Sequence, residues 1–136
     1  MDPTAGAKPI SARDFDAALL LLQAKGRMPM RVASGSMLPV IQVGEVIDVE
    51  PLGPDEVPAR FDILVFWNER LLICHYLWHV NQLRNPGEAR TFITRSLGGH
   101  EDLPFSESQV LGRVVSHRLS RFWRFRLALT RVLRNK

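Results

Sequence analysis

Two serines lie in a short segment whose neighbours could prepare them for chemistry. The segment reads Ser34-Gly35-Ser36-Met37-Leu38-Pro39. Ser36 therefore lies between a glycine, which tolerates unusual backbone angles, and a proline, which fixes φ and removes a hydrogen-bond donor. A serine held in this way would present its hydroxyl and its own N–H to a ligand. The same residue types are ordinary turn formers, so the segment alone predicts only a turn.

Five further blocks follow the serines in an order that changes this interpretation. They occupy residues 44–51, 61–66, 73–76, 92–95 and 109–115. Their order resembles the signal-peptidase-like and LexA-like serine peptidases, whose blocks read roughly SxSMxP, GDxVxV, GDIVVF, a base-bearing strand ending in HR or KR, TKGD and a final GxV strand. The similarity covers about residues 32–115. The resemblance implies that Ser36 is a nucleophile, and that its N–H and the Ser34 hydroxyl form an oxyanion hole.

The identity of the general base depends on which basic residues the chain has. Members of this group activate the serine with either a lysine or a histidine. The chain has three lysines, Lys8, Lys25 and Lys136. None lies in the strands expected after Ser36, which argues against a Ser–Lys pair. The resemblance instead implies His75 as the base, at the position of the histidine in the endoplasmic-reticulum and archaeal type of signal peptidase. The family pattern there is His-Arg, whereas this chain has His75-Tyr76.

His79 is the rival histidine. Residues 71–80 have the pattern of a strand in which His75 and His79 would share one face. Four residues at about 3.3 Å each would separate the two by about 13 Å. They could then neither both reach Ser36 nor both bind one metal ion, whose ligands lie about 2 Å from it. We interpret His75 as the base and His79 as a structural residue, and expect no metal or cofactor.

A carboxylate is expected to orient the imidazole, as in Ser-His-Asp sites. The TKGD block of the resembled families is altered here to Thr94-Arg95-Ser96-Leu97, with Leu97 in place of the aspartate. The next acids are Glu101 and Asp102. Asp102 falls near the later aspartate of the histidine-type members and is the predicted orienting acid, with Glu101 as the alternative. Both could instead lie in a solvated turn beside glycine.

Composition limits the class of protein. A chain of 136 residues with 46% hydrophobic and 24% charged residues predicts one globular domain with a substantial core. Its single cysteine, Cys74, cannot form an internal disulfide, and it alternates away from His75. No segment approaches the roughly 20 apolar residues of a membrane-spanning helix, and the start of the chain lacks the features of a secretory signal. We therefore expect a cytoplasmic protein, soluble or peripherally attached to the membrane.

Local patterns predict a mainly β fold, with a compact, mostly antiparallel, barrel-like peptidase domain. Residues 1–27 are expected to form a tail and a helix over 11–25, capped by Ser11 and ended by Gly26. Four apolar residues at helical spacing should pack it on the domain: Phe15, Ala18, Leu19 and Leu22. Residues 28–116 form the expected catalytic domain, with strands at 30–33, 46–50, 63–67, 71–80, 90–94 and 110–116.

Residues 117–136 have the pattern of a basic amphipathic helix. Its apolar residues could share much of one face: Leu119, Phe122, Leu129, Val132 and Leu133. Such a helix could lie on an anionic membrane surface, dock on an acidic protein, or pack on its own domain with its arginines outward. Nucleic acid is a weaker option, because the net charge is only +4 and no RNA- or DNA-binding motif is present.

Two functions follow from these observations. The first is a serine endopeptidase that matures a dedicated peptide or protein precursor, with small side chains before the scissile bond as the resemblance implies. The second is a non-catalytic module that binds a peptide or partner on the same fold. The altered TKGD block favours the second, as does Phe61, which replaces the glycine expected before Asp62. The presence of both Ser36 and His75 favours the first, and a hydrogen bond between these two side chains would discriminate them.

Overall fold

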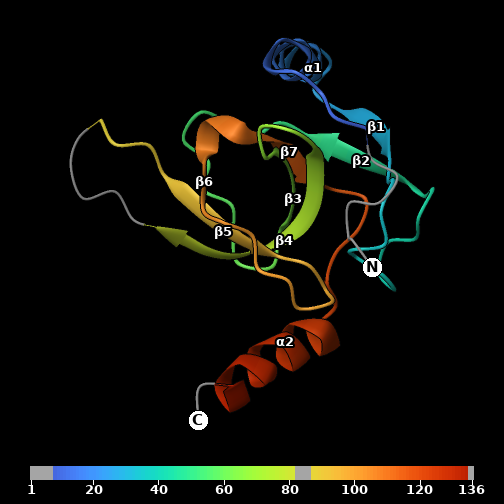
Figure 1. The fold of residues 1–136 in the computed structure, drawn as a ribbon, viewed down its shortest axis with the longest axis vertical. Helices are drawn as coiled ribbons and strands as arrows, with labels where there is room; N and C mark the ends of the chain where they lie inside the picture. The colour runs from blue at the N-terminus through green and yellow to red at the C-terminus, as the bar shows by residue number, and fades with distance from the viewer. Residues whose placement is uncertain (1–7, 82–86, 135–136) are drawn as a thin grey trace.

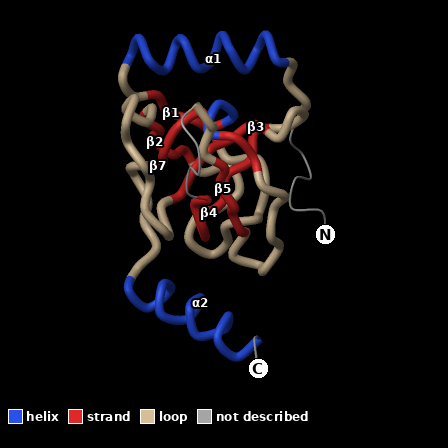
Figure 2. Tube along the Cα trace, turned by 90° about the vertical axis from the view of Figure 1, so that its left-hand side faces the viewer, coloured by secondary structure: helices blue, strands red, loops and turns tan. Residues whose placement is uncertain are grey.

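The computed structural model describes residues 8–81 and 87–134, with side chains described up to Leu129. The predicted tail at 1–7 and the last two residues of the predicted C-terminal helix lie outside this part. The described part forms one antiparallel sheet and two helices, and the helices lie at opposite ends of the molecule (Figures 1 and 2). Its strands are β1 Met28–Arg31, β2 Val46–Glu50, β3 Ile63–Trp67, β4 Leu72–Asn81, β5 Thr91–Arg95, β6 Phe105–Ser106 and β7 Val110–Val114.

The strand order is β1-β2-β7-β3-β4-β5-β6, so the last strand of the chain lies in the middle of the sheet. The sheet curls into a half-barrel with β1 and β6 at its edges (Figure 1). The prediction of a mainly β, antiparallel fold is confirmed. β2 and β3 have the predicted bounds, whereas β1 begins two residues before the predicted strand. β6 was not predicted, because a two-residue strand has no detectable alternation.

Helix α1, Ala12–Lys25, forms as its sequence predicts. The Ser11 hydroxyl accepts a hydrogen bond from the Asp14 N–H at 3.1 Å, and Gly26 ends the helix in the left-handed conformation at φ 79°. Phe15 and Leu22 are buried against the sheet. The Phe15 ring stacks on Trp67 of β3 with 5.3 Å between ring centroids. These contacts fix the helix on one face of the sheet.

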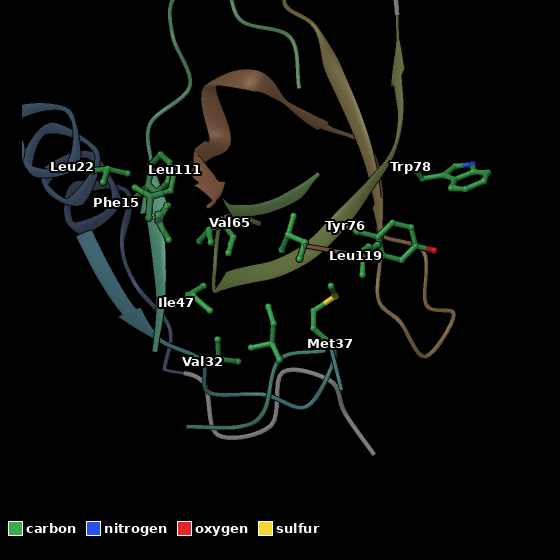
Figure 3. Close-up of a cluster of buried hydrophobic side chains, with 14 residues drawn as sticks. Phe15, Leu22, Val32, Met37, Ile47, Val65, Tyr76, Trp78, Leu111 and Leu119 are labelled. Atoms are coloured by element: carbon green, nitrogen blue, oxygen red, sulfur yellow. The ribbon is translucent and has the colours of Figure 1, made fainter. Parts of the chain in front are cut away.

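The core lies on both faces of the sheet. Alternate residues of β3 point to opposite sides, so Ile63 and Val65 join the cluster beneath α1, while Leu64 and Phe66 join a second cluster with Phe92 and Phe105. Figure 3 shows the first cluster, to which Met37 and Leu119 also belong. Burial on both faces explains why β3 reads as an uninterrupted apolar run rather than as an alternating one.

The predicted position of His79 is wrong. The pairing of β4 with β5 runs from Leu77↔Thr94 to His79↔Ile93, so Trp78 is an extra residue that forms a β-bulge. One added residue reverses the alternation of every later side chain. His79 is consequently exposed, and Val80 packs against the second cluster instead.

The backbone requires glycine at Gly112 and accommodates a phenylalanine at Phe61, where the resembled families have glycine. At Gly112 of β7 a Cβ atom would collide with the Glu50 carbonyl and the Val49 side chain of β2, so only glycine fits. Phe61 has φ 76°, a backbone conformation that favours glycine. Its ring lies 6.1 Å from that of Tyr76 and 5.9 Å from that of Trp78. These aromatic contacts offset the backbone strain, so the turn is kept without glycine.

Helix α2, Arg121–Arg134, differs from the predicted amphipathic helix. Leu119 is buried in the domain, but it precedes the helix. Trp123 and Leu127 make the contacts with the domain, whereas Phe122 and Leu129 are exposed. The predicted apolar face is therefore not the face that packs on the domain, and its members Val132 and Leu133 have side chains outside the described part. In the described chain neither helix has the length and apolar character needed to cross a bilayer.

Candidate active site

The segment that carries Ser36 is anchored on both sides of the serine. Met37 and Ile41 are buried in the first cluster. The Leu38 N–H donates to the Gly35 carbonyl at 3.1 Å, and the Ile41 N–H donates to the Met37 carbonyl at 2.9 Å. The loop thus follows from two apolar anchors and two turn hydrogen bonds, and it holds Ser36 in a fixed, buried position.

Two hydrogen bonds connect Ser36 to other elements. Its carbonyl accepts from the Leu97 N–H at 3.0 Å, in the segment after β5. Its hydroxyl donates to the Cys74 carbonyl of β4 at 3.5 Å, a length at the limit for such a bond. The fold therefore brings the serine segment against both segments that carry the predicted base and acid.

His75 and Asp102 are in direct contact. The Nδ1 atom of His75 lies 2.5 Å from Oδ2 of Asp102. The side chains are only 2% and 15% exposed, respectively. A carboxylate at Nδ1 fixes the tautomer with the proton on Nδ1 and leaves the lone pair on Nε2. Such a pair can take up a proton at Nε2 and stabilise the resulting imidazolium.

A hairpin-like turn after β5 brings Asp102 to this position. The Asp102 N–H donates to the Thr94 carbonyl at 2.9 Å, and the Ser96 N–H donates to the His100 carbonyl at 2.9 Å. The Thr94 hydroxyl also donates to Oδ2 of Asp102 at 2.6 Å, the same oxygen that contacts His75. Thr94 is fully buried and was not predicted as a site residue. Its place at the head of the altered TKGD block was the only signal for it in the sequence.

The alternative acid, Glu101, points elsewhere. Its carboxylate pairs with Arg95, with Oε1 2.7 Å from Nη2, and it is exposed. His100, given no role from the sequence, is also exposed, and its Nε2 lies 3.6 Å from Oδ1 of Asp102. Of the two candidate carboxylates, the structure therefore brings Asp102 to His75.

The second ring nitrogen of His75 has no partner among the described residues. Nε2 is buried and makes no hydrogen bond to any residue that the structure describes. The His75 and Phe66 rings are inclined at 65°, with 6.2 Å between the two ring centroids. The Ser36 hydroxyl donates to the carbonyl of Cys74, the residue before His75. Within the described chain it makes no hydrogen bond to His75 itself. The proposed discriminating bond is thus unformed here, and the link that the structure shows between the two residues is the contact of the Ser36 hydroxyl with the carbonyl of Cys74, the residue before His75.

Ser34 lies beside the predicted nucleophile. Its hydroxyl oxygen is 3.2 Å from that of Ser36. The Ser36 N–H donates to no described residue, so it remains available to a ligand. An apolar pocket of about 170 Å³ opens next to Ser34. Its lining includes Met30, Val32, Ile47, Val65, Leu72 and Cys74.

The Cys74 side chain lies on the opposite face of β4 from His75, although Cys74 also lines the pocket beside Ser34. The side chain packs on the first cluster. Burial raises the pKa of its thiol to about 12, so it carries almost no thiolate at neutral pH. In the described part of the chain, no group of three or more His, Cys, Asp and Glu residues could hold a metal ion.

Comparisons of the chain with protein-family models, with curated proteins and with solved structures find no match. The functional assignment therefore depends on the geometry just described.

Proposed function

We propose that the chain is a serine endopeptidase in which Ser36 is the nucleophile and His75 the general base. Asp102 orients His75, and the Ser36 N–H and the Ser34 hydroxyl stabilise the oxyanion. The substrate is a peptide or protein precursor, and the domain is a half-barrel version of the signal-peptidase-like fold. The reaction requires no metal or cofactor.

The observation that carries this proposal is the His75–Asp102 pair, whose buried Nε2 has no hydrogen-bond partner in the described part of the chain. Leaving a buried polar atom without a hydrogen bond costs about 1–3 kcal/mol, and such atoms are uncommon in folded proteins. A neutral imidazole with its lone pair on Nε2 needs a donor there. A serine hydroxyl is such a donor, and the Ser36 hydroxyl is 3.5 Å from the carbonyl oxygen of Cys74, the residue before His75. Catalytic hydrogen bonds are often long in the free enzyme and tighten when substrate binds.

The reaction follows from these positions. Ser36 Oγ attacks the scissile carbonyl carbon while its proton passes to Nε2 of His75. The negatively charged carbonyl oxygen is stabilised by the Ser36 N–H and the Ser34 hydroxyl. His75 returns the proton to the leaving amine, which gives an acyl-enzyme, and water then hydrolyses the ester by the same proton route. The apolar pocket beside Ser34 would accept a small side chain next to the scissile bond.

A second candidate function is a peptide-binding module without activity. The specific observation in its favour is that Ser36 donates to the Cys74 carbonyl rather than to His75. If that arrangement persists with substrate bound, the hydroxyl is not activated. The same pocket would then bind a peptide side chain without cleavage.

A serine-directed fluorophosphonate probe tests the proposal without knowledge of the substrate. The folded chain should be labelled, mass spectrometry should place the adduct on Ser36, and Ser36→Ala should abolish labelling. Ser116→Ala is the matched control, because Ser116 also contacts a histidine but lies at the surface, and it should be labelled like the wild type. A folded chain that is not labelled would contradict the peptidase.

A peptide library separates the two functions further. The peptidase should cleave some members, and Ser36→Ala should bind these members without cleaving them. Binding by both chains with no cleavage by the wild type would assign the non-catalytic module instead.

A further inference from the structure

Helix α2 exposes a row of large apolar side chains on the side that faces away from the domain. Phe122, Phe125 and Leu129 are 67%, 69% and 45% exposed. They follow one another at intervals of three and four residues, which is the spacing of one helical face. The row extends over about 10 Å at 1.5 Å per residue.

The contacts with the domain are made by a different face. Trp123 and Leu127 pack against the first cluster. At 100° per residue, their mean direction lies about 150° from that of the exposed row. The row is therefore not an edge of the interface between α2 and the domain, and covering it requires something outside the described chain.

Arginines border the row on both of its sides. The same helical geometry places Arg121 about 40° beyond Phe125 and Arg126 about 40° beyond Phe122. Both arginines are exposed, and the guanidinium of Arg126 also lies over the Trp123 ring, 5.3 Å from its centroid. Further positive charge lies at the start of the helix, where Arg118 and Arg124 line a cavity of about 430 Å³. The partner of this surface is consequently apolar where it meets the row and negatively charged around it.

We infer that α2 docks in the plane of an anionic lipid surface, with Phe122, Phe125 and Leu129 among the acyl chains and the flanking arginines on lipid phosphates. Aromatic and leucine side chains on one face, with arginines beside them, are the features of helices that lie in the membrane interface. The long arginine side chains can keep their charged ends at headgroup level while their stems cover the apolar row.

The direct test is sedimentation of the full chain with vesicles. The chain should bind vesicles of phosphatidylcholine with about one third phosphatidylglycerol. Its affinity for vesicles of pure phosphatidylcholine should be lower by a factor of about ten or more. Replacing Phe122, Phe125 and Leu129 together by serine should reduce binding at least about tenfold. Replacing Arg121 and Arg126 by glutamine should reduce it about fivefold for each charge removed.

Helix α1 provides the matched control. Leu20 and Leu21 are 67% and 46% exposed, on a helix at the other end of the molecule (Figure 2). Their joint replacement by serine should leave binding unchanged. Equal loss in both variants would mean that nonspecific apolar adhesion, not α2, causes binding, and would overturn the inference. Far-UV circular dichroism shows whether each variant keeps its helices.

Depth of insertion gives a second measurement. A tryptophan introduced by Phe125→Trp should gain fluorescence quenching from lipids brominated on the acyl chain, whereas Leu20→Trp should not. The inference is overturned if anionic vesicles do not bind the chain, or if the Phe122, Phe125 and Leu129 variant binds them like the wild type. It is also overturned if the row instead joins two copies of the chain, seen as a dimer in analytical ultracentrifugation that the triple variant abolishes. None of these results depends on the peptidase.

Discussion

In the described part of the chain, two histidine–carboxylate pairs have almost the same contact distance and different surroundings. His75 Nδ1 lies 2.5 Å from Asp102, and His117 Nε2 lies 2.6 Å from Glu45. The side chains of the second pair are 17% and 35% exposed, so it lies much nearer the solvent than the first. The short contact alone therefore does not distinguish the two.

The difference lies at the other ring nitrogen. Nδ1 of His117 is 2.7 Å from the Ser116 hydroxyl, which also accepts the Asp48 N–H at 2.9 Å. This serine, histidine and glutamate form a complete chain that connects the end of β7 to β2 and to the turn before it. His75 has a carboxylate on one side and no described partner on the other. The second pair is a satisfied structural contact, whereas Nε2 of His75 is the buried nitrogen that the proposed mechanism uses.

The largest expected effect is a difference in labelling rate between variants of the two histidines. His75→Gln should abolish labelling by the fluorophosphonate probe, because removing the base of a Ser-His-Asp site costs about 10⁶-fold in kcat. His117→Gln should be labelled at the wild-type rate. The measurement is the rate of adduct formation by mass spectrometry, with thermal unfolding to show that both variants fold. Equal rates in the wild type and His75→Gln would remove His75 from the mechanism.

The second largest effect should separate Asp102 from Glu45 by the labelling rate of their amide variants. Asp102→Asn keeps the shape of the side chain but favours the wrong tautomer of His75, and in Ser-His-Asp sites such a loss costs about 10⁴-fold. Glu45→Gln should leave the labelling rate unchanged. Comparison with Glu101→Gln then tests the acid that was the alternative from the sequence. If Glu101→Gln slows labelling more than Asp102→Asn does, the contact between His75 and Asp102 is not the catalytic one.

Most of the strands could be predicted from the sequence, because their apolar runs are bounded by proline, glycine and asparagine. The helix over 11–25 was predictable from its cap residues, Ser11 and Gly26. The reversal of side chains after Trp78 was not, because a β-bulge depends on how β4 pairs with β5 and leaves no periodic signal in β4 alone.

The candidate site divides in the same way. Ser36, His75 and Asp102 could be proposed from the order of sequence blocks, whereas the contact of Thr94 with Asp102 depends on the turn between them. The packing face of α2 was also beyond the sequence. Its apolar residues surround much of the helix, and only the position of the domain decides that Trp123 and Leu127 are covered.

A smaller effect is expected at Thr94, which we place as a positioning residue. Thr94→Val keeps the volume but removes the hydrogen bond to Asp102, which should slow labelling about tenfold. Thr94→Ser restores a hydroxyl and should recover most of the rate. If both variants are slowed equally, the threonine acts through packing, and the network around Asp102 ends at His75.

The smallest effect should concern the acid stability of the surface pair. Hydrogen bonds from the Gln42 N–H and then from His117 lower the pKa of Glu45 from its ordinary value of 4.5. A carboxylate whose pKa is lower in the folded state stabilises the fold above its unfolded pKa, and this contribution is lost as the pH falls through the folded pKa. Glu45→Gln should therefore be less stable than the wild type at about pH 7, and the difference should shrink toward about pH 3.

Urea unfolding at several pH values measures this difference. His117→Gln should show a smaller change, because the larger contribution to the lowered pKa, the backbone hydrogen bond from Gln42, remains. A stability difference between Glu45→Gln and the wild type that does not vary with pH would mean that Glu45 acts through packing rather than charge. The Glu45–His117 pair would then not stabilise the fold electrostatically. It would differ from the His75–Asp102 pair only in burial and in the absence of a described partner at Nε2 of His75.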